Sequence, residues 1–205
     1  MTTDALVGME AWAADTYSRF PASYWSVDDN GRGAEVARAV AALIAQDDLP
    51  PLGPASHVFE SGCNMGQCLW ALQQQYGCRV SGLDLSPRAV AFARRVLGPT
   101  IRGENALTSA WLAARPDQAF DLVLTRWHLV HLPPSARKHA YVAHLQRIGR
   151  ASVFFEPWRR DCADRPVHDP GMLMIMESWA RYGLREVDVA PAWRVAGTRI
   201  YLGKG

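Results

Sequence analysis

The chain has 205 residues, of which 49% are hydrophobic and 20% are charged, and its formal net charge is +2. This composition is typical of a globular protein and excludes a disordered or fibrous one, and the length suits a single domain. The near balance of charge gives no support to a nucleic-acid partner. We find no apolar run long enough for a membrane span and no signal-peptide pattern, so we expect a cytoplasmic protein without membrane contact.

The first 32 residues precede any regular pattern, and we expect them to form a helical cap on a core of residues 33–205. The cap is rich in aromatic residues. We expect two of them, Tyr24 and Trp25, to contact a bound substrate, with packing against the core as the alternative. The core begins with "GAEVARAVAALIAQDD", whose apolar residues recur at helical spacing until "LPPLGP" ends the helix.

Strand-like and helical segments then alternate, which is typical of an α/β protein with a parallel sheet. We expect helices over 65–76 and 87–98, after the two prolines at 133–134, and near 171–182. Ser86 and Pro87 supply the N-cap and the first residue of the second helix. Seven strands are expected, at 57–61 and within "CRVSGLDLS", "TIRGEN", "FDLVLTRW", "ASVFFEPW", "LREVDVA" and "TRIYLG".

A glycine-containing turn joins the first of these strands to the following helix. It reads E-x-G-x-N-x-G, with Gly62 and Gly66 on either side of Asn64. Glycines let a ligand approach the backbone, and the free N–H groups of the following helix attract polar ligand groups. Asn64 is one of the few residue types that tolerate a left-handed conformation. The dinucleotide fingerprint requires a further glycine where Gln67 stands, so an NAD-linked oxidoreductase is disfavoured.

An acidic residue ends the second strand at a distance that suits a nucleoside ligand. Asp84 stands 18 positions after Gly66, close to the offset of about 20 residues at which an acid meets ribose hydroxyls in such folds. The alternative is a carboxylate that only supports the entry to the helix beside Ser86. With the glycine turn in front of it, we expect Asp84 to bind a ribose.

The four cysteines do not indicate a metal or redox site. Cys63, Cys68, Cys78 and Cys162 form no C-x-x-C pair and no zinc-like set with histidine. We therefore expect reduced thiols and no metal.

Four segments in this order and spacing, "VFESGCNMGQ", "GLDLSPRAVAFARR", "FDLVLTRWHLVHLPP" and "VFFEPW", resemble the class I S-adenosylmethionine-dependent methyltransferases. The resemblance covers nearly the whole chain from about residue 35. It implies a three-layer Rossmann-like sandwich, with a mostly parallel sheet of order 3-2-1-4-5-7-6 in which strand seven is antiparallel.

The resemblance also implies a cofactor site. The glycine turn would lie against the methionine part of S-adenosylmethionine, the acid would bind its ribose, and the segment after strand three would flank its adenine. Two features depart from the family pattern: Asn64 replaces a common glycine, and "RGENAL" replaces a common Gly-Asp-Ala. The implied cofactor contacts are Glu60, Gly62, Cys63, Asn64, Gly66, Asp84, Leu85, Glu104, Asn105, Ala106 and Thr125.

The segment after strand four, "TRWHLVHLPP", contains the candidates for catalysis. Histidine titrates in the range useful for a base, and the family keeps acceptor-facing residues here, so we expect His131 or His128 to activate the acceptor. The alternative for each is a loop histidine bonded to backbone. We expect Trp127 and Glu156 to contact the substrate, although Trp127 also suits the core.

The predicted function is methyl transfer from S-adenosylmethionine to a small-molecule acceptor, at an oxygen of a metabolite, sugar or natural product, which leaves S-adenosylhomocysteine. A first alternative is an inactive cofactor-binding partner of another protein. A second is a thiopurine-type sulfur methyltransferase, of which Arg137 and Tyr141 keep part of the pattern. We expect a monomer or a homodimer.

Overall fold

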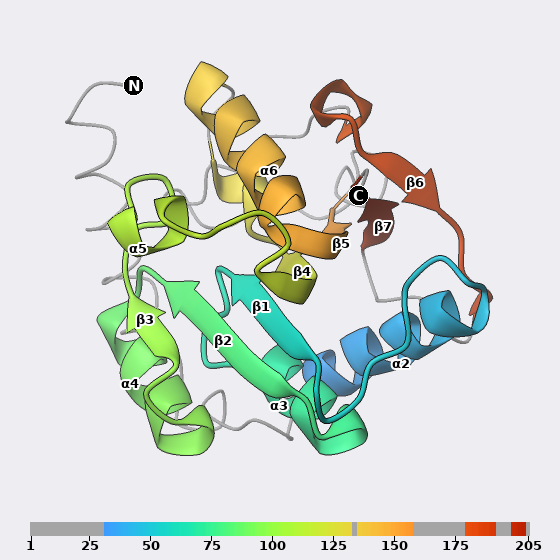
Figure 1. Cartoon of the computed structure of the whole chain (residues 1–205), viewed down its shortest axis with the longest axis horizontal. Helices are drawn as coiled ribbons and strands as arrows, with labels where there is room; N and C mark the ends of the chain where they lie inside the picture. Colours follow the sequence, from blue (N-terminus) through green and yellow to red (C-terminus); the bar gives the residue numbers. More distant parts are fainter. Residues whose placement is uncertain (1–30, 133–134, 158–178, 192–197, 204–205) are drawn as a thin grey trace, which may run out of the picture.

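The computed structural model describes residues 31–132, 135–157, 179–191 and 198–203, and within them one sheet of seven strands (Figure 1). Its order is β3-β2-β1-β4-β5-β7-β6. All neighbouring strands pair in parallel except β7, which is antiparallel to β5 and β6. The predicted strand order and the antiparallel seventh strand are confirmed. The strands are β1 His57–Ser61, β2 Arg79–Asp84, β3 Ile101–Gly103, β4 Phe120–Arg126, β5 Gly149–Glu156, β6 Arg185–Val187 and β7 Arg199–Leu202.

The helices of the described residues connect these strands. Five are α-helices and two are short 3-10 turns, here called η2 and η3. Their bounds are α2 Arg32–Ala45, α3 Gln67–Tyr76, α4 Pro87–Leu97, α5 Ala110–Ala113, η2 Leu129–His131, α6 Ala136–Ile148 and η3 Trp179–Tyr182.

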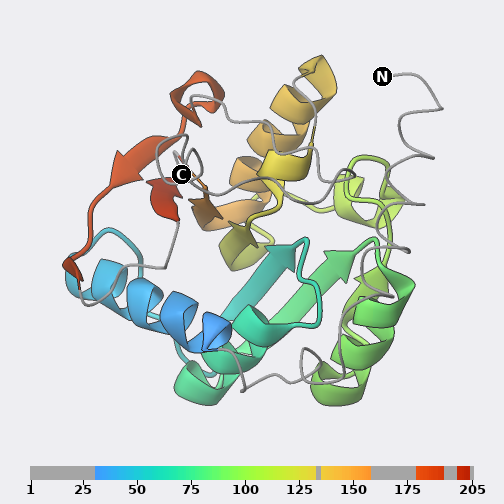
Figure 2. The same ribbon diagram turned by 180° about the vertical axis from the view of Figure 1, so that it is seen from behind.

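The sheet is the middle layer of three. Successive strand residues face opposite sides of a sheet, so Val58 packs into one hydrophobic cluster and Phe59 into the other. The first cluster includes side chains of α2, α3 and α4, and the second includes those of α5, α6 and η3. Figures 1 and 2 show these two groups of helices on the two sides of the sheet. None of the described helices is both long enough and apolar enough to cross a membrane.

Most predicted elements are present within one or two residues of their expected bounds. The Ser86 side chain caps α4 by accepting a hydrogen bond from the backbone of Ala89 at 3.3 Å. Helix α6 begins at Ala136, because the hydroxyl of Ser135 caps it by accepting from the backbone of Lys138. The short helix α5 was not predicted.

Some expectations fall outside the described residues. They are residues 1–30 of the cap, with Tyr24 and Trp25, and also Cys162 and most of the helix expected near 171–182, of which only the turn η3 is described.

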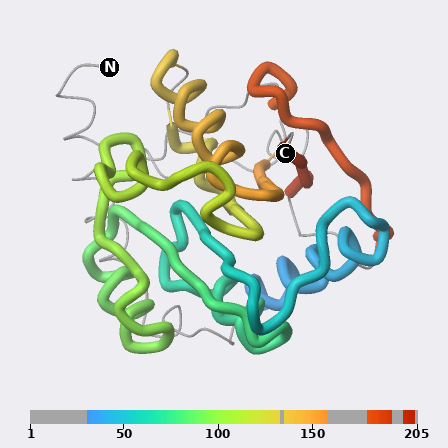
Figure 3. The backbone as a smooth tube through the Cα atoms, viewed as in Figure 1, coloured from blue at the N-terminus to red at the C-terminus, as the bar shows by residue number. Residues whose placement is uncertain are grey.

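Parallel pairing brings the carboxyl ends of β1, β2, β4 and β5 to one edge of the sheet. In open α/β sheets, ligands bind at this edge. The backbone trace in Figure 3 shows the turns that leave these strands. The turn from β1 to α3, residues 62–66, is called the glycine loop below, and the segment from residue 127 to η2 is called the post-β4 loop.

Candidate cofactor and acceptor site

The glycine loop is held against β2 by its backbone. The N–H groups of Gly62 and Cys63 both donate to the carbonyl oxygen of Leu83, at 2.9 and 3.0 Å. Three of its residues have positive φ: Gly62 at 72°, Asn64 at 49° and Gly66 at 82°. Asparagine thus adopts the left-handed conformation that its residue type tolerates. Cys63 is buried, so it contributes its backbone to the loop surface more than its thiol.

Asp84 connects the glycine loop to the start of α4. Its Oδ2 accepts a hydrogen bond from the backbone of Asn64 at 2.7 Å, and its Oδ1 accepts one from the backbone of Ser86 at 2.8 Å. Burial raises the pKa of Asp84, and bonds from the N–H groups of Ser86, Asn64 and Leu85 oppose the rise. The carboxylate therefore does support the entry to α4. Its free lone pairs remain available for a ribose, a role that stays a prediction.

Glu60, one residue before the end of β1, is a second buried carboxyl group at this edge. Burial raises its pKa to about 8, although hydrogen bonds from Cys68 and the backbone of Leu69 and the charge of Arg126 oppose this. Its Oε2 has no hydrogen-bond partner among the described residues, and neither does Nε of Arg126. Buried polar atoms are normally paired, so these two atoms indicate a place for a polar ligand or water.

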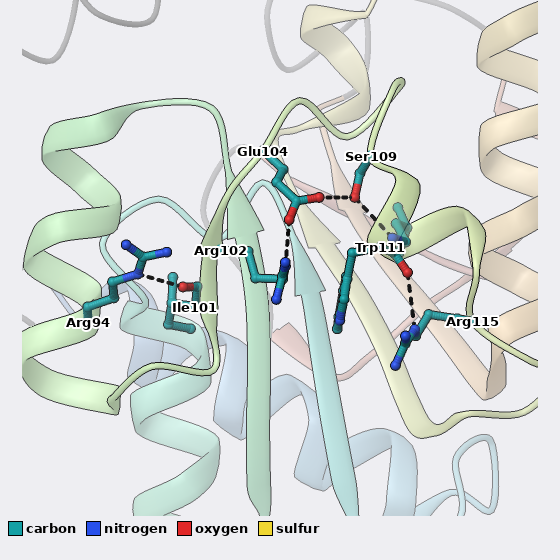
Figure 4. A network of polar contacts seen from close by, with 8 residues as sticks. Arg94, Ile101, Arg102, Glu104, Ser109, Trp111 and Arg115 are labelled. Atoms are coloured by element: carbon teal, nitrogen blue, oxygen red, sulfur yellow. Dashed lines mark hydrogen bonds and ion pairs between the residues drawn. The ribbon is translucent and has the colours of Figure 1, made fainter.

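Glu104, which follows β3, is already engaged by protein groups (Figure 4). Its Oε1 forms an ion pair with Arg102, and its Oε2 accepts a hydrogen bond from the hydroxyl of Ser109. Although partial burial raises the pKa of Glu104, these two partners hold it below its ordinary value. Its backbone N–H donates to the carbonyl oxygen of Asp84 at 3.1 Å, so β3 ends beside the glycine-loop site.

Asn105 offers a better placed polar group for an adenine. Its Oδ1 accepts a hydrogen bond from the backbone of Leu107 at 3.0 Å, which fixes the amide plane. Its Nδ2 is buried without a partner among the described residues. Ala106 packs against the cluster that includes Leu83 and Leu112. Of the two adenine candidates, Asn105 therefore has the free donor, while Glu104 is bonded to Arg102 and Ser109.

The post-β4 loop is anchored by Glu156, the last residue of β5. Its Oε1 accepts hydrogen bonds from the hydroxyl of Thr125 at 2.8 Å and from the backbones of His128 and Leu129 at 3.2 and 3.1 Å. Its Oε2 accepts from the backbone of Val130 at 3.3 Å. The side chain is fully buried, and burial raises its pKa to about 7 against these donors. These contacts give no support to the expectation that Glu156 meets a substrate, because its oxygens bind the loop.

Trp127 has a backbone conformation unusual for its type. Its φ is 50°, which costs energy for a bulky residue, and its N–H donates to the carbonyl oxygen of Phe155 at 2.8 Å. Its indole Nε1 donates to the hydroxyl of Thr198 at 2.7 Å. The ring is partly buried and reaches toward the start of β7, so it belongs to neither hydrophobic cluster.

The two candidate histidines lie in the same loop and are both poor bases. Nε2 of His128 lies 3.1 Å from the hydroxyl oxygen of Tyr141. Burial, together with the positive charges of His131 and Lys138, lowers the pKa of His128 to about 3. Burial and Lys138 lower the pKa of His131 to about 4. Both imidazoles are therefore neutral at physiological pH.

The glycine loop and the post-β4 loop meet directly. A Cβ atom added to Gly62 would come within 2.4 Å of Nδ1 of His128, so only glycine leaves room for this ring. The structure thus brings together the expected loop, Asp84, Asn105 and His128 at one edge of the sheet.

Sequence reasoning assigned no contact at this site to three residues that the structure brings to it, although it named Tyr141 for the thiopurine-type pattern. They are Ser61 at the end of β1, and Lys138 and Tyr141 on α6. Lys138 is fully buried: its Nζ donates to the carbonyl oxygen of Leu132 at 2.9 Å and lies 4.9 Å from the ring centre of Trp179. A lysine in the first turn of a helix gives no local signal of burial.

Comparison with known proteins agrees with this geometry. Residues 58–150 match a family model described as "Methyltransferase domain". The 2-methyl-6-phytyl-1,4-hydroquinone methyltransferase of Synechocystis is 24% identical over 73% of this chain and 48% of its own length. The trans-aconitate 2-methyltransferase of Escherichia coli is 34% identical over 49% of this chain and 37% of its own length. The chain thus spans about half the length of the first relative and less of the second.

A solved structure extends the likeness to the whole fold. Magnesium protoporphyrin IX methyltransferase of Synechocystis, crystallised with bound S-adenosylmethionine, superposes with a TM-score of 0.63 at 19% identity, over 98% of this chain and 97% of that one. Residues 58–150 thus match a methyltransferase domain, and the sheet order β3-β2-β1-β4-β5-β7-β6 gives the chain the fold of the class I S-adenosylmethionine-dependent methyltransferases.

Proposed function

We propose that the chain binds S-adenosylmethionine at the carboxyl edge of its sheet and transfers the methyl group to an acidic oxygen of a small molecule. The observation that carries the cofactor assignment is the set of buried polar atoms without partners among the described residues. They include Oε2 of Glu60 beside the glycine loop and Nδ2 of Asn105 after β3. A ligand with an ammonium group at one end and a purine at the other has complementary groups for both.

Each part of the site has a proposed task in holding the cofactor. Gly62 and Gly66 let it approach the backbone, and Oε2 of Glu60 is positioned to accept a hydrogen bond from its ammonium group. Asp84 accepts from the ribose hydroxyls, and Asn105 donates to the adenine ring. When bound, the cofactor would supply a methyl group on a positively charged sulfur.

The chain's own contribution to the reaction is chiefly orientation and exclusion of water. Displacement at a methyl group needs the acceptor atom in line at contact distance, which a fixed site supplies. Glu156 fixes the post-β4 loop, and the positive charge of Lys138 helps to keep His131 and His128 neutral. With pKa values of about 3 and 4, His128 and His131 would be weak bases. An acceptor that is already ionised, such as a carboxylate or an acidic phenol, needs no base.

The nature of the relatives supports a small acceptor. By their names, two of them methylate a hydroquinone and trans-aconitate, and neither name refers to a macromolecule. Trans-aconitate is itself a carboxylate, which agrees with the acidic oxygen proposed here.

Calorimetry with S-adenosylmethionine and S-adenosylhomocysteine tests the first half of the proposed function. We expect binding of both ligands, weakened in Asp84→Ala. The matched control is Asp117→Asn, whose carboxylate pairs with Arg147 at the surface. Absence of binding to either ligand at high micromolar concentration would reject the proposed function.

A panel of carboxylates, phenols, neutral alcohols, amines and thiols tests the second half, with S-adenosylhomocysteine release measured by mass spectrometry. We expect turnover with acidic oxygens. Turnover restricted to thiols would favour the thiopurine-type alternative. Cofactor binding without turnover on any member would favour the inactive partner module.

A further inference from the structure

Three side chains form a hydrogen-bonded series that ends at the glycine loop. The hydroxyl of Ser61, at the end of β1, forms a hydrogen bond with the hydroxyl of Tyr141 on α6. The same Tyr141 oxygen lies 3.1 Å from Nε2 of His128, and the two rings meet edge to face with centres 5.9 Å apart. Ser61 is fully buried and Tyr141 is 6% exposed, so water does not compete for these groups.

Only one arrangement of the hydrogen atoms in this series lets both hydroxyl groups donate a hydrogen bond. Within the described residues, the hydroxyl of Ser61 bonds to Tyr141 alone. If Ser61 donates to Tyr141, then Tyr141 donates to Nε2 of His128 and both hydroxyl hydrogens are paired. The reverse direction leaves the hydrogen of Ser61 without an acceptor in a buried place, which costs roughly 1–3 kcal/mol. The favoured direction makes Nε2 of His128 an acceptor.

This direction fixes the other ring nitrogen. A neutral imidazole carries one hydrogen, so an accepting Nε2 places that hydrogen on Nδ1. The Nδ1 edge lies over Gly62, where an added Cβ would be only 2.4 Å away. In the described part of the chain, Nδ1 makes no hydrogen bond. The backbone N–H of His128 donates to Glu156.

Burial, more than charge, keeps the ring in its neutral form. His131 in η2 and Lys138 on α6 further disfavour a positive charge on His128. Tyr141 stays a phenol, because burial raises its pKa well above the ordinary value, against an opposing bond from Ser61 and with a further rise from the charge of Glu156. It is therefore a donor throughout the physiological range.

We propose that His128 is a fixed N–H donor to an oxygen atom of the ligand beside Gly62, and that Ser61 and Tyr141 are positioning residues that hold it in this tautomer. This role rests on the proposed function, because the ligand is its cofactor or its acceptor. The oxygen belongs either to the carboxylate of the cofactor or to the acceptor. His128 does not act as the base, since its free nitrogen lone pair faces Tyr141 and not the ligand.

Nuclear magnetic resonance of the unliganded protein tests the tautomer without any activity. Long-range proton–nitrogen correlations of the imidazoles distinguish a protonated from an unprotonated ring nitrogen, and His128→Asn identifies the signals of His128. We expect a neutral ring with hydrogen on Nδ1 from about pH 5 to about pH 8. Hydrogen on Nε2, or a charged ring in this range, would overturn the inference even if the protein binds the cofactor.

Two variants test the direction in which the hydrogen bonds of this series are donated. Tyr141→Phe removes the donor to Nε2, so we expect the hydrogen to move to Nε2. Ser61→Ala leaves that donor in place, so we expect hydrogen to remain on Nδ1. Under the reverse direction, Ser61→Ala would disturb the ring instead. Tyr76→Phe is the matched control, because it removes a phenol hydroxyl that bonds to Gln75 at the surface. Retained circular dichroism checks that each variant folds.

Ligand addition identifies the source of the oxygen. If the Nδ1–H signal shifts with S-adenosylhomocysteine but not with methylthioadenosine, which lacks the carboxylate, the cofactor is the partner. His128→Ala should then weaken S-adenosylhomocysteine binding by about tenfold, and His128→Asn, which keeps an N–H near the same position, should restore most of it. If neither ligand shifts the signal but an acceptor does, the acceptor is the partner. A signal that none of them shifts would overturn the donor role.

Discussion

The glycine loop and the post-β4 loop lie at the same edge of the sheet, and each is tied down by a buried carboxylate from the neighbouring strand. Asp84, at the end of β2, accepts from the backbone of the glycine loop. Glu156, at the end of β5, accepts from three successive backbone N–H groups of the post-β4 loop. The difference lies in what each loop leaves free. The glycine loop has no side chain at Gly62 and Gly66, whereas the post-β4 loop carries the side chains of Trp127, His128 and His131.

This difference suits two tasks. Under the proposed function, glycines would let the cofactor approach the backbone, and fixed side chains would face the reacting end of the ligands. The four predictions below test whether the two carboxylates and the contact between the loops have these separate roles.

The largest expected effect is the loss of the anchor in the post-β4 loop. Glu156→Ala leaves several buried donors without an acceptor, and we expect the free energy of unfolding to fall by about 4 kcal/mol. Denaturant unfolding measures this. Glu186→Ala is the control, since Glu186 pairs with Arg199 at the surface and should change stability by about 0.5 kcal/mol or less. Equal effects in the two variants would show that Glu156 is not an anchor.

The contact between the two loops comes next. Gly62→Ala adds a Cβ that overlaps His128 and strains a backbone at φ 72°, so we expect a loss of about 3 kcal/mol in unfolding free energy. Gly77→Ala, at φ 67° with its nearest neighbour 3.6 Å away, carries the backbone strain alone and should cost about 1 kcal/mol. The additional loss of unfolding free energy in Gly62→Ala, compared with Gly77→Ala, should shrink when His128 is also replaced by alanine. If this additional loss stayed the same without the His128 ring, the overlap with His128 would not be its cause.

Asp84 provides the corresponding test of the glycine loop. Asp84→Ala removes a charged acceptor from the proposed ribose site, and we expect S-adenosylhomocysteine to bind roughly 30-fold more weakly, which is about 2 kcal/mol. Calorimetry measures the affinity, and denaturant unfolding run in parallel separates it from the loss of the loop contacts. A dissociation constant like that of the parent protein would refute the ribose role.

The smallest effect concerns the pH dependence of stability. The pKa of Glu60 is about 8 in the folded protein, above its value of 4.5 when unfolded, so the folded state holds the proton more tightly. Stability is therefore highest at low pH with respect to this group and falls as pH rises from 4.5 to 8. The raised pKa of Glu156, about 7, also makes the unfolding free energy fall with rising pH, but over a lower pH range. The lowered pKa values of His128 and His131 make the unfolding free energy rise with pH below pH 6.5.

Between pH 7 and pH 8 Glu60 is left as the main contributor, and we expect the unfolding free energy to fall by about 1 kcal/mol per pH unit. Unfolding curves at these two pH values measure the slope. Glu60→Gln should flatten it, and Glu104→Gln should not, because the pKa of Glu104 is below its ordinary value. A slope that persists in Glu60→Gln would assign it to another group.

The parts of the fold that the sequence predicted depend on local signals. The cap of α4 is one, since Ser86 and Ala89 are three residues apart, and the continuous apolar run of β4 is another. The strand order came from the family resemblance, because no local pattern specifies which strands pair.

The contacts that were missed join residues far apart in the sequence. Glu156 binds backbone groups 26–28 positions away and the hydroxyl of Thr125, 31 positions away, so its role as an anchor depends on the pairing of β4 with β5. Lys138 is buried because Trp179 and Tyr182 cover it, which nothing in its own helix indicates. The same holds for the link from Ser61 through Tyr141 to His128, which joins β1, α6 and the post-β4 loop.

The buried cysteines beside the glycine loop have a practical consequence. Cys63 and Cys68 are 3% and 5% exposed, and burial raises the pKa of both thiols well above the ordinary value. Alkylating reagents attack thiolates that they can reach, so labelling requires the loop to open. In a protein with Cys162 replaced by serine, the labelling rate of Cys63 then reports how often this loop opens. Any ligand that binds across the loop should lower this labelling rate.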